Sequence, residues 1–452
     1  MPFILAFALI VLAGCALPAR AQADDATNLR LPQAAPETNS SAASATAAWN
    51  TPIAQVTADS ALVWRIYRDL HEHPELGMRE KRTAEVLRRE LRQLGYSHFV
   101  ESKSAPTAVI AVLDTRKPGP VIALRAEMDA RPTQEPESHD PRSTIDGVMH
   151  NCGHDAHAAM LVGSAAVLMR NRESLSGKIV FVWQPAEETR GGADDIVNEG
   201  ILQELGVQAI FAQHVVSGTP VGTVGVSGGP TMAGSNYFTL RISGSGSHAA
   251  QPSAGSDIVL AAAALVRELA VFPARRLDIL ERPMVISPTS FEAGSETATN
   301  VLPSEAVIRG TIRAFEKVVA SAPDDSSLES KLRDYLNGAA SSLGVTYELS
   351  IREGSPPTVN DDRLFRELSG PLAATWGSGF DTTPYRGMFS EDFSFYTAVI
   401  PSLYFGLGIS KDGLGDAGVH SANFTLHPSA LVQGTRFLVE LATTAGEVLN
   451  GK

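Results

Sequence analysis

The stretch Ile179-Val-Phe-Val-Trp183, followed at once by Gln184-Pro-Ala-Glu-Glu188, points most directly to the fold. A short run of β-branched and aromatic residues predicts a buried strand. Three other apolar runs have the same character, at 108–113, 121–124 and 209–213. Helical patterns alternate with these runs, at 155–171 and 192–204. This alternation predicts an α/β domain with a central mixed sheet and helices on both of its faces.

Beyond Ala233 the pattern changes, and it predicts a second, smaller domain. The predicted strands lie at 238–243, 284–291, 305–315 and 345–351, and the predicted helices at 257–269 and 325–341. The chain then returns to the first domain near Pro357, with a strand at 402–405 and a last helix at 429–448. We therefore predict a larger α/β domain over 56–233 and 353–452, interrupted by an α+β domain at 234–352.

The N-terminal residues predict export. The apolar run from Phe3 to Leu17 is too short to span a bilayer and is typical of a signal peptide, which we place at 1–23. Residues 24–55 have the composition of a flexible linker. The motif Leu12-Ala-Gly-Cys15 suits lipid attachment at Cys15, whereas Ala19-Arg-Ala-Gln-Ala23 suits ordinary cleavage. Both alternatives predict a periplasmic or secreted protein with no integral membrane span.

The net charge limits the classes of partner that the protein can bind, and the cysteine content limits its disulfides. The net charge is -13, and no run of Lys and Arg is present, which excludes a nucleic-acid binding role. Small molecules are the expected partners. The chain has two cysteines, and Cys15 lies in the leader, so Cys152 has no partner for an internal disulfide. A lone cysteine in an oxidising compartment needs burial or a metal.

The densest group of chemically active residues is Met149-His-Asn-Cys-Gly-His-Asp-Ala-His157, which places one thiol and three imidazoles within nine residues. Cys152 and His154 are one residue apart, and Gly153 between them allows the backbone to bend. A thiolate and an imidazole so placed can bind one metal pair. The alternative is a set of surface histidines beside a buried cysteine, which the crowding disfavours.

Glu187 and Glu188 follow directly after a predicted strand, and ligands of open α/β sheets bind at such carboxyl ends. Adjacent residues leaving a strand point in different directions, so one carboxylate can bind metal while the other takes a proton from water. His214 and Asp129 also follow predicted strands, and His420 lies in a late Gly-rich loop. Alone, each histidine is more often structural than a ligand, and Asp129 suits a role in orienting a ligating histidine.

Four motifs together resemble the amidohydrolase branch of the aminoacylase and carboxypeptidase G type metallopeptidases. They are Arg125-Ala-Glu-Met-Asp-Ala130, the 149–157 motif, Gln184-Pro-Ala-Glu-Glu188 and Gly246-Ser-His-Ala-Ala-Gln-Pro252. That branch includes hippurate hydrolases, auxin-conjugate hydrolases and N-acetyl-diaminopimelate deacetylases. The resemblance runs in order from about His71 to the C-terminus.

The resemblance implies a dinuclear amidohydrolase with two divalent metal ions, such as zinc, manganese, cobalt or nickel. It implies that Cys152 bridges the metals and that four further residues complete the ligand set: His154, Glu188, His214 and His420. Glu187 would be the general base and later the general acid. The implied substrates are N-acyl amino acids or related small amides. A dipeptidase or carboxypeptidase, and a noncatalytic exported metal- or solute-binding protein, remain as alternatives.

The resemblance also implies that 234–352 is a lid and dimerisation domain. His248 would reach a neighbouring active site in a homodimer, and Asn300 and Arg313 would bind the substrate carboxylate. Arg313 has an equally good structural interpretation as an ordinary strand arginine. Four positions depart from the family pattern and put substrate preference in doubt: Glu127, Arg131, Ser253 and His427.

Overall fold

The computed structural model describes residues 54–189, 191–319 and 326–451. The predicted signal peptide, Cys15 and all but the last two residues of the predicted linker lie outside the described residues. Within the described part of the chain, no helix combines the length and apolarity needed to cross a bilayer.

Eight strands form one mixed sheet in the order β1-β2-β4-β3-β5-β16-β6-β15. Its centre consists of four parallel neighbours: β4 (Lys178–Gln184), β3 (Val121–Glu127), β5 (Ala209–Pro220) and β16 (Ser402–Ser410). The other four strands are β2 (Val109–Asp114), which is antiparallel to β4, and the short β1 (Phe99–Val100), β6 (Val224–Gly225) and β15 (Phe380–Asp381). The predicted fold class is confirmed.

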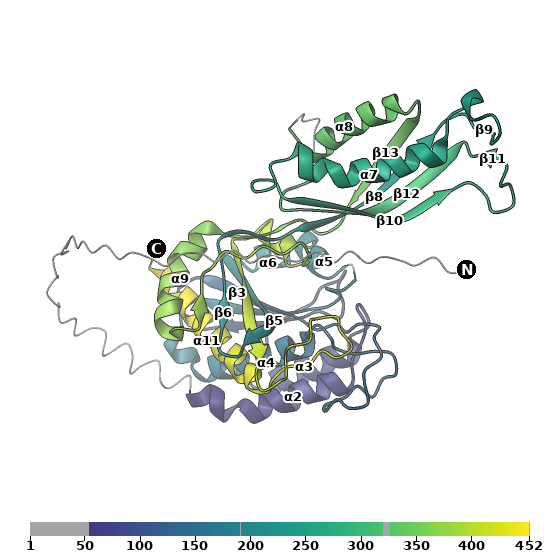
Figure 1. Ribbon diagram of the computed structural model, residues 1–452. Helices are drawn as coiled ribbons and strands as arrows, with labels where there is room; N and C mark the ends of the chain where they lie inside the picture. Colours follow the sequence, from purple (N-terminus) through teal and green to yellow (C-terminus); the bar gives the residue numbers. More distant parts are fainter. Residues whose placement is uncertain (1–53, 190, 320–325, 452) are drawn as a thin grey trace, which may run out of the picture. The chain divides into compact units, whose positions relative to one another are not determined.

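Helices cover both faces of this sheet, because alternate residues of a strand face opposite sides. In β4, Phe181 and Trp183 belong to one hydrophobic core and Val182 to another. The first core is closed by α2 (Ser60–Glu72), α3 (Lys81–Gln93), α4 (His154–Arg170), α9 (Asp362–Trp376) and α11 (Ser429–Asn450). The second is closed by α5 (Ala193–Asn198), α6 (Ile201–Glu204) and α10 (Ser394–Thr397). Figure 1 shows α2 and α4 on one side of the sheet and α5 and α6 on the other.

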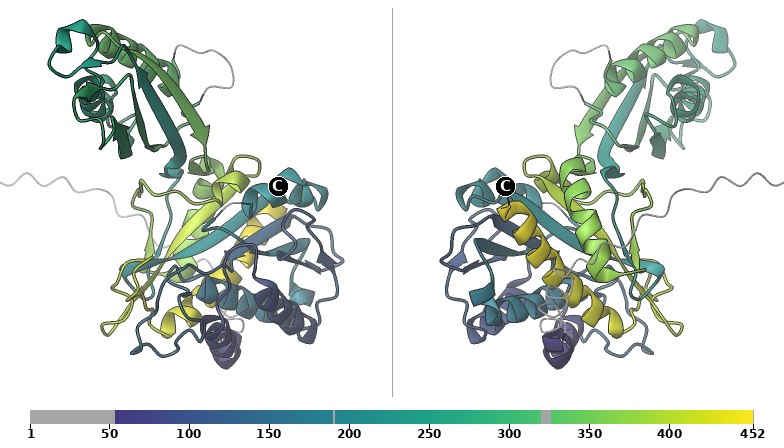
Figure 2. Two further views of the ribbon diagram at one scale, coloured as in Figure 1. Left: turned by 90° about the vertical axis from the view of Figure 1, so that its right-hand side faces the viewer. Right: turned by 90° about the vertical axis from the view of Figure 1, so that its left-hand side faces the viewer.

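The inserted segment forms an antiparallel sheet of its own, in the order β10-β12-β8-β13. Its strands are β8 (Gly234–Ser243), β10 (Met284–Ala293), β12 (Glu305–Ala314) and β13 (Thr346–Glu353). The buried side chains Phe238, Leu240 and Ile242 alternate along β8 and pack against α7 (Ile258–Arg276) and α8 (Leu328–Ser342). Figure 2 shows α7 and α8 together with the sheet that they cover. In the larger domain, the same figure shows α9 in green beside α11 in yellow.

Short elements complete the fold. Two small ladders pair β9 (Ser247–His248) with β11 (Val301–Leu302), and β7 (Gly229–Met232) with β14 (Thr358–Asn360). Two 3-10 turns lie at Arg172–Ser174 and Pro252–Ala254.

Three expectations about secondary structure need correction. The predicted helix at 192–204 is two helices, because Gly200 between them has φ +73°, a conformation that interrupts helical hydrogen bonding. The helix α9 was not predicted, since Gly370 and Pro371 weaken its pattern. His214 was expected at a strand end, but β5 continues to Pro220 because β16 still pairs with it after β3 has separated at Ala212.

Candidate metal centre

The predicted ligand residues meet where β3, β4 and β5 end their mutual pairing. Cys152 precedes α4, Glu188 follows β4, His214 lies on β5, and His420 lies in the loop after β16. The ligand atoms of Cys152, Glu188 and His420 all lie within 4.8 Å of one another, as do those of His154, Glu187 and Glu188. Cys152 Sγ and His214 Nε2 are 3.5 Å apart. The structure therefore brings all five predicted ligands and Glu187 into one cluster.

His154 has one ring nitrogen fixed and the other free. Its Nδ1 donates to the carbonyl oxygen of Asp129 at 2.9 Å and lies 3.2 Å from Asp129 Oδ1. Its Nε2 is buried and has no hydrogen-bond partner among the described residues. Burying an imidazole nitrogen without a partner destabilises the folded protein unless a bound group, such as a metal ion, interacts with that nitrogen. The same Asp129 carboxylate accepts the backbone N–H of Glu188 at 3.0 Å, so one side chain orients two ligands.

His214 is also arranged as a ligand. Its Nδ1 donates to the carbonyl oxygen of Val215 at 2.8 Å, which leaves the Nε2 lone pair facing Cys152. Burial, reinforced by the charge of His157, lowers the pKa of His214 to about 4. The imidazole is therefore neutral at neutral pH, the form that binds metal.

His157 lies beside these ligands but has no free nitrogen. Its Nδ1 is 2.8 Å from Glu127 Oε2, and its Nε2 accepts the backbone N–H of Val215 at 3.0 Å. Although His157 falls within the same group of potential ligands as His154 and His214, its hydrogen bonds assign it to holding β5 in place.

The thiol of Cys152 is buried, and this raises its pKa above the usual value despite the opposing charge of His154. A divalent cation acts in the opposite direction and deprotonates a coordinating thiol. Buried sulfur, two oriented imidazole nitrogens and a carboxylate are ligands that suit zinc and related transition metals. The residues present thus fit the metal pair that the resemblance implies.

Glu188 and His420 contact each other and Arg131. Glu188 Oε1 is 3.0 Å from His420 Nε2, Arg131 forms an ion pair with Glu188, and its Nη1 is 3.4 Å from His420 Nε2. Burial opposes ionisation of Glu188, but the hydrogen bond from His420 and the charges of His154, His420 and Arg131 lower its pKa to about 2. The departure from the family pattern at Arg131 therefore places a positive charge on two ligands.

Replacing this arginine should strengthen metal binding. We expect Arg131→Leu to raise the affinity for zinc or manganese by roughly 5- to 30-fold, since a charge at the edge of the cluster is worth about 1–2 kcal/mol. Calorimetric titration of the metal-free protein at fixed ionic strength measures this. The control is Arg363→Leu, which removes an exposed charge on α9 that pairs with Glu367. Equal or weaker affinity in Arg131→Leu would refute the expectation.

Glu187 is surrounded by carboxylates that sequence reasoning missed. Its carboxyl lies within 4.8 Å of those of Glu391 and Asp392. Burial, followed by the charges of Glu391, Asp392 and Glu188, raises the pKa of Glu187 well above its usual value. In the sequence, only the adjacent acidic residues of Ser390-Glu-Asp-Phe393 hint at these carboxylates. Such a pair of acidic residues is equally common on an exposed surface.

Arg125 holds this acidic group together. Its guanidinium is fully buried and forms ion pairs with Glu127, with Glu391 at 2.8 Å and with Asp392 at 2.6 Å. Its Nε donates to Gln184 Oε1 at 2.8 Å. Glu127, another departure from the family pattern, therefore joins Arg125 to His157, and its carboxylate lies within 4.8 Å of ring nitrogens of His154 and His214.

None of the three predicted residues of the inserted domain contacts a predicted metal ligand through a hydrogen bond or ion pair between described residues. His248 is exposed on β9, with Val301 opposite it on β11, and Asn300 accepts the backbone N–H of Ala249 at 2.9 Å. No hydrogen bond or ion pair between described residues joins either side chain to the cluster. Arg313 donates to Ser390 Oγ at 2.7 Å, next to Glu391.

The remaining departures are also outside the cluster. Ser253 is exposed in the turn Pro252–Ala254. His427 Nδ1 is 2.6 Å from Ser429 Oγ, and its Nε2 is 3.7 Å from Asp412 Oδ2. The structure thus places His420, and not His427, beside Glu188.

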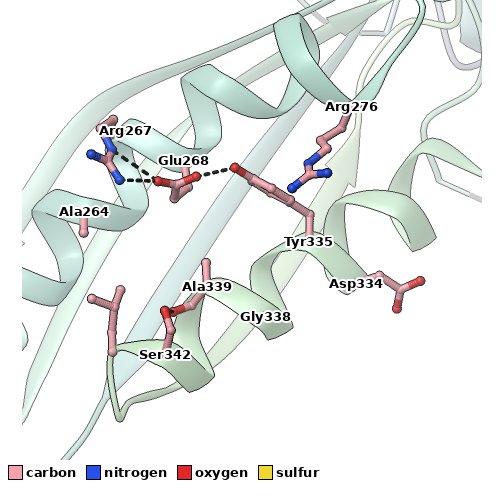
Figure 3. A pocket seen from close by; sticks show the side chains of 10 residues that line it. Ala264, Arg267, Glu268, Arg276, Asp334, Tyr335, Gly338, Ala339 and Ser342 are labelled. Carbon is pink, nitrogen blue, oxygen red and sulfur yellow. Dashed lines mark hydrogen bonds and ion pairs between the residues drawn. The ribbon is translucent and has the colours of Figure 1, made fainter.

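A separate hollow of about 480 Å³ lies between α7 and α8 on the inserted domain (Figure 3). Several of its polar residues contact one another: Arg267 pairs with Glu268 at 2.7 Å, Tyr335 donates to Glu268, and Arg276 lies over the Tyr335 ring at 5.2 Å. None of the predicted site residues lines it.

The fold and the cluster define a metal-dependent hydrolase, and comparisons with known proteins give its family. The sequence model of Peptidase family M20/M25/M40 matches residues 123–444. N-acetylcysteine deacetylase of Bacillus subtilis (strain 168) is 35% identical over 396 residues, which are 87% of this chain and 100% of that protein. N-acyl-L-amino acid amidohydrolase of Geobacillus stearothermophilus is 37% identical over 329 residues, which are 70% of this chain and 85% of that protein.

A solved structure of similar fold points to the same family. The crystal structure of a Bacillus subtilis protein, described as a dinuclear metal binding peptidase from the M20 family, has a TM-score of 0.74 at 32% identity and covers 87% of this chain and 99% of that one. The chain belongs to peptidase family M20/M25/M40, which confirms the predicted resemblance. It is accordingly a dinuclear metal-dependent hydrolase of the amidohydrolase and peptidase type.

Proposed function

We propose that the protein hydrolyses the amide bond of N-acyl amino acids and releases a carboxylic acid and a free amino acid. The observation that carries this proposal is the carboxyl of Glu187, which lies within 4.8 Å of ligand atoms of His154 and Glu188 without being needed to complete the ligand set. The names of N-acetylcysteine deacetylase and N-acyl-L-amino acid amidohydrolase support acyl amino acids as the substrate class.

In this proposal the chain holds two divalent cations, such as zinc, manganese, cobalt or nickel, on Cys152, His154, Glu188, His214 and His420. When bound, these cations would acidify a water molecule and polarise the scissile carbonyl. Asp129 keeps His154 in the tautomer that presents Nε2.

Glu187 takes the proton from the attacking water and later gives it to the departing amine. Its raised pKa makes it a stronger base than an exposed glutamate, and nearby cations would lower that pKa again. Because the same carboxyl accepts and returns the proton, no covalent enzyme intermediate is required.

The amide class can be tested with purified protein and a substrate panel. The panel contains N-acetyl and N-benzoyl amino acids, dipeptides with a free amino terminus, and N-acyl amino amides that lack the carboxylate. Release of amine from the first group, with slower cleavage of the other two, is the expected result. Faster cleavage of dipeptides would favour a dipeptidase or carboxypeptidase, and metal binding without any cleavage would favour a binding protein.

We also propose that the inserted domain pairs two copies of the chain, with His248 of one copy serving the site of the other. The strand β10 is an edge of its sheet, and eight large apolar residues among those described in this domain are exposed: Tyr237, Val259, Leu260, Ile279, Leu280, Val285, Phe291 and Val301. Exposed apolar surface of this kind is typical of an interface. Light scattering should give twice the chain mass, and a monomer active at the same specific rate would refute the proposal.

Residues 1–23 support a further proposal, that the protein is exported. Cell fractionation should find it in the periplasm or the medium. Labelling with a fatty-acid analogue that is lost in Cys15→Ser would assign lipid attachment, unlabelled protein beginning after Ala23 would assign ordinary cleavage, and full-length protein in the cytoplasm would contradict export.

A further inference from the structure

We propose that Glu80 is a positioning residue that holds the backbone turn Pro185–Thr189 and thereby aims Glu187 into the ligand cluster. This inference rests on the proposed function, because it takes Glu187 to be the general base. Glu80 is the N-cap residue, directly before the helix α3, and lies more than a hundred residues earlier in the chain than the turn that it contacts.

The contacts of Glu80 are unusual for a buried carboxyl. The residue has 0% exposure, yet no ion pair between described residues includes it. Its Oε1 accepts the backbone N–H of Ala186 at 3.0 Å and that of Met78 at 2.9 Å. Its Oε2 accepts the hydroxyl of Thr107 at 2.9 Å. Every partner of this carboxyl is therefore a neutral donor, and one of them lies next to Glu187.

Ala186 needs such an anchor because of its backbone conformation. It has φ +58°, in the left-handed region that residues with a side chain rarely adopt. This conformation turns the chain sharply after β4, so that the following residue faces the cluster. If the acceptor were removed, the buried N–H of Ala186 would lose its partner, and the turn could relax toward a commoner conformation.

The same turn is held from a second direction. Asp129 Oδ2 accepts the N–H of Glu188 at 3.0 Å. On the side of Glu80, Gly77 approaches so closely that an added Cβ would lie 3.1 Å from Ala186 Cα and 2.5 Å from Thr189 Oγ1. The segment 77–80 therefore packs closely against the turn Pro185–Thr189. Asp129 fixes the ligand Glu188, and Glu80 fixes the residue that precedes Glu187.

This arrangement needs an acceptor and does not need a charge. Burial raises the pKa of Glu80 to about 7, so neutral and ionised forms both occur near neutral pH. An amide oxygen can accept the same two N–H groups, and its NH₂ can donate to the Thr107 hydroxyl. Glutamine should therefore replace Glu80, whereas a residue without an acceptor should not.

The test compares Glu80→Ala with Glu80→Gln and with a matched control, Glu75→Ala. The carboxylate of Glu75 accepts the N–H groups of Arg82 and Thr83 at the start of the same helix. Its side chain therefore supports α3 without contacting the turn. Glu80→Met, which fills a similar volume without a strong acceptor, replaces the alanine variant if that variant does not fold.

We expect Glu80→Ala to lower kcat by roughly 10- to 100-fold with metal content and KM nearly unchanged, the effect of a catalytic group displaced by about 1 Å. Glu80→Gln and Glu75→Ala should stay within about threefold of the unaltered protein.

A spectrum without substrate separates this inference from the proposed function. In the cobalt-loaded protein, Glu80→Ala should alter the visible absorption of the metal site, because Glu188 belongs to the same turn, while Glu80→Gln and Glu75→Ala should not. That result would stand even if N-acyl amino acids proved not to be substrates. An unchanged spectrum and kcat in Glu80→Ala, an equal loss in Glu75→Ala, or an equal loss in Glu80→Gln would each overturn the positioning role.

Discussion

Glu187→Gln should lower kcat by roughly 10²- to 10⁴-fold, the usual contribution of a general base, while the protein keeps its full metal content. Glutamine has nearly the same shape but cannot take a proton from water. Glu187 is not one of the proposed ligands, and its Oε2 is 4.0 Å from His154 Nε2, so we expect this substitution of similar shape to leave the proposed ligands in place. Steady-state kinetics with an acyl amino acid, together with elemental analysis of the metal, measure both parts of the expectation.

The matched control for this variant is Glu391→Gln, which changes a neighbouring carboxyl that accepts hydrogen bonds from Arg125 and Tyr404. It should affect activity much less than Glu187→Gln does. If Glu187→Gln instead loses metal and regains activity when metal is added in excess, Glu187 belongs to the ligand set and is not the base.

Cys152→Ala should weaken metal binding by more than roughly 100-fold and remove activity with it. Changes in groups that only orient ligands already cost about 10- to 100-fold, so loss of a proposed ligand itself should cost more. The thiol is buried beside His214, and alanine fills most of its space without offering a ligand atom. Metal titration of the stripped protein measures the loss.

Two histidine variants test the ligand set further, with His420 as a proposed ligand and His427 as the matched control. His420→Ala should also weaken metal binding, because His420 contacts Glu188, whereas His427→Ala should not, because His427 contacts Asp412 and Ser429. Tight metal binding in Cys152→Ala, or a larger loss in His427→Ala than in His420→Ala, would show that the ligand set is wrong.

Much of the fold was predictable because its central strands carry an unambiguous pattern. The run Ile179–Trp183 has apolar residues at every position, and the structure buries it between helices on both faces. The cluster was predictable in the same way, since Cys152 and His154 are neighbours in sequence and Glu188 follows a strand. Patterns made by neighbouring residues, such as these, can be recognised in a single sequence.

The residues that the sequence did not reveal act through long-range contacts. Arg125 meets Glu391 and Asp392 across more than 260 positions, and Glu80 meets Ala186 across 106. Neither Glu391 nor Glu80 lies in a motif whose spacing marks it as special. Their importance comes from burial and from the partners that the folded chain supplies, which no local pattern encodes.

The most direct test of the central claim is amine release from an N-acyl amino acid by protein stripped of metal and then supplied with zinc, manganese, cobalt or nickel in turn. We predict that the stripped protein is inactive, that at least one metal restores cleavage, and that about two ions per chain are bound at full activity. Undiminished cleavage by the stripped protein would contradict the account, as would silence across the panel with both ions bound.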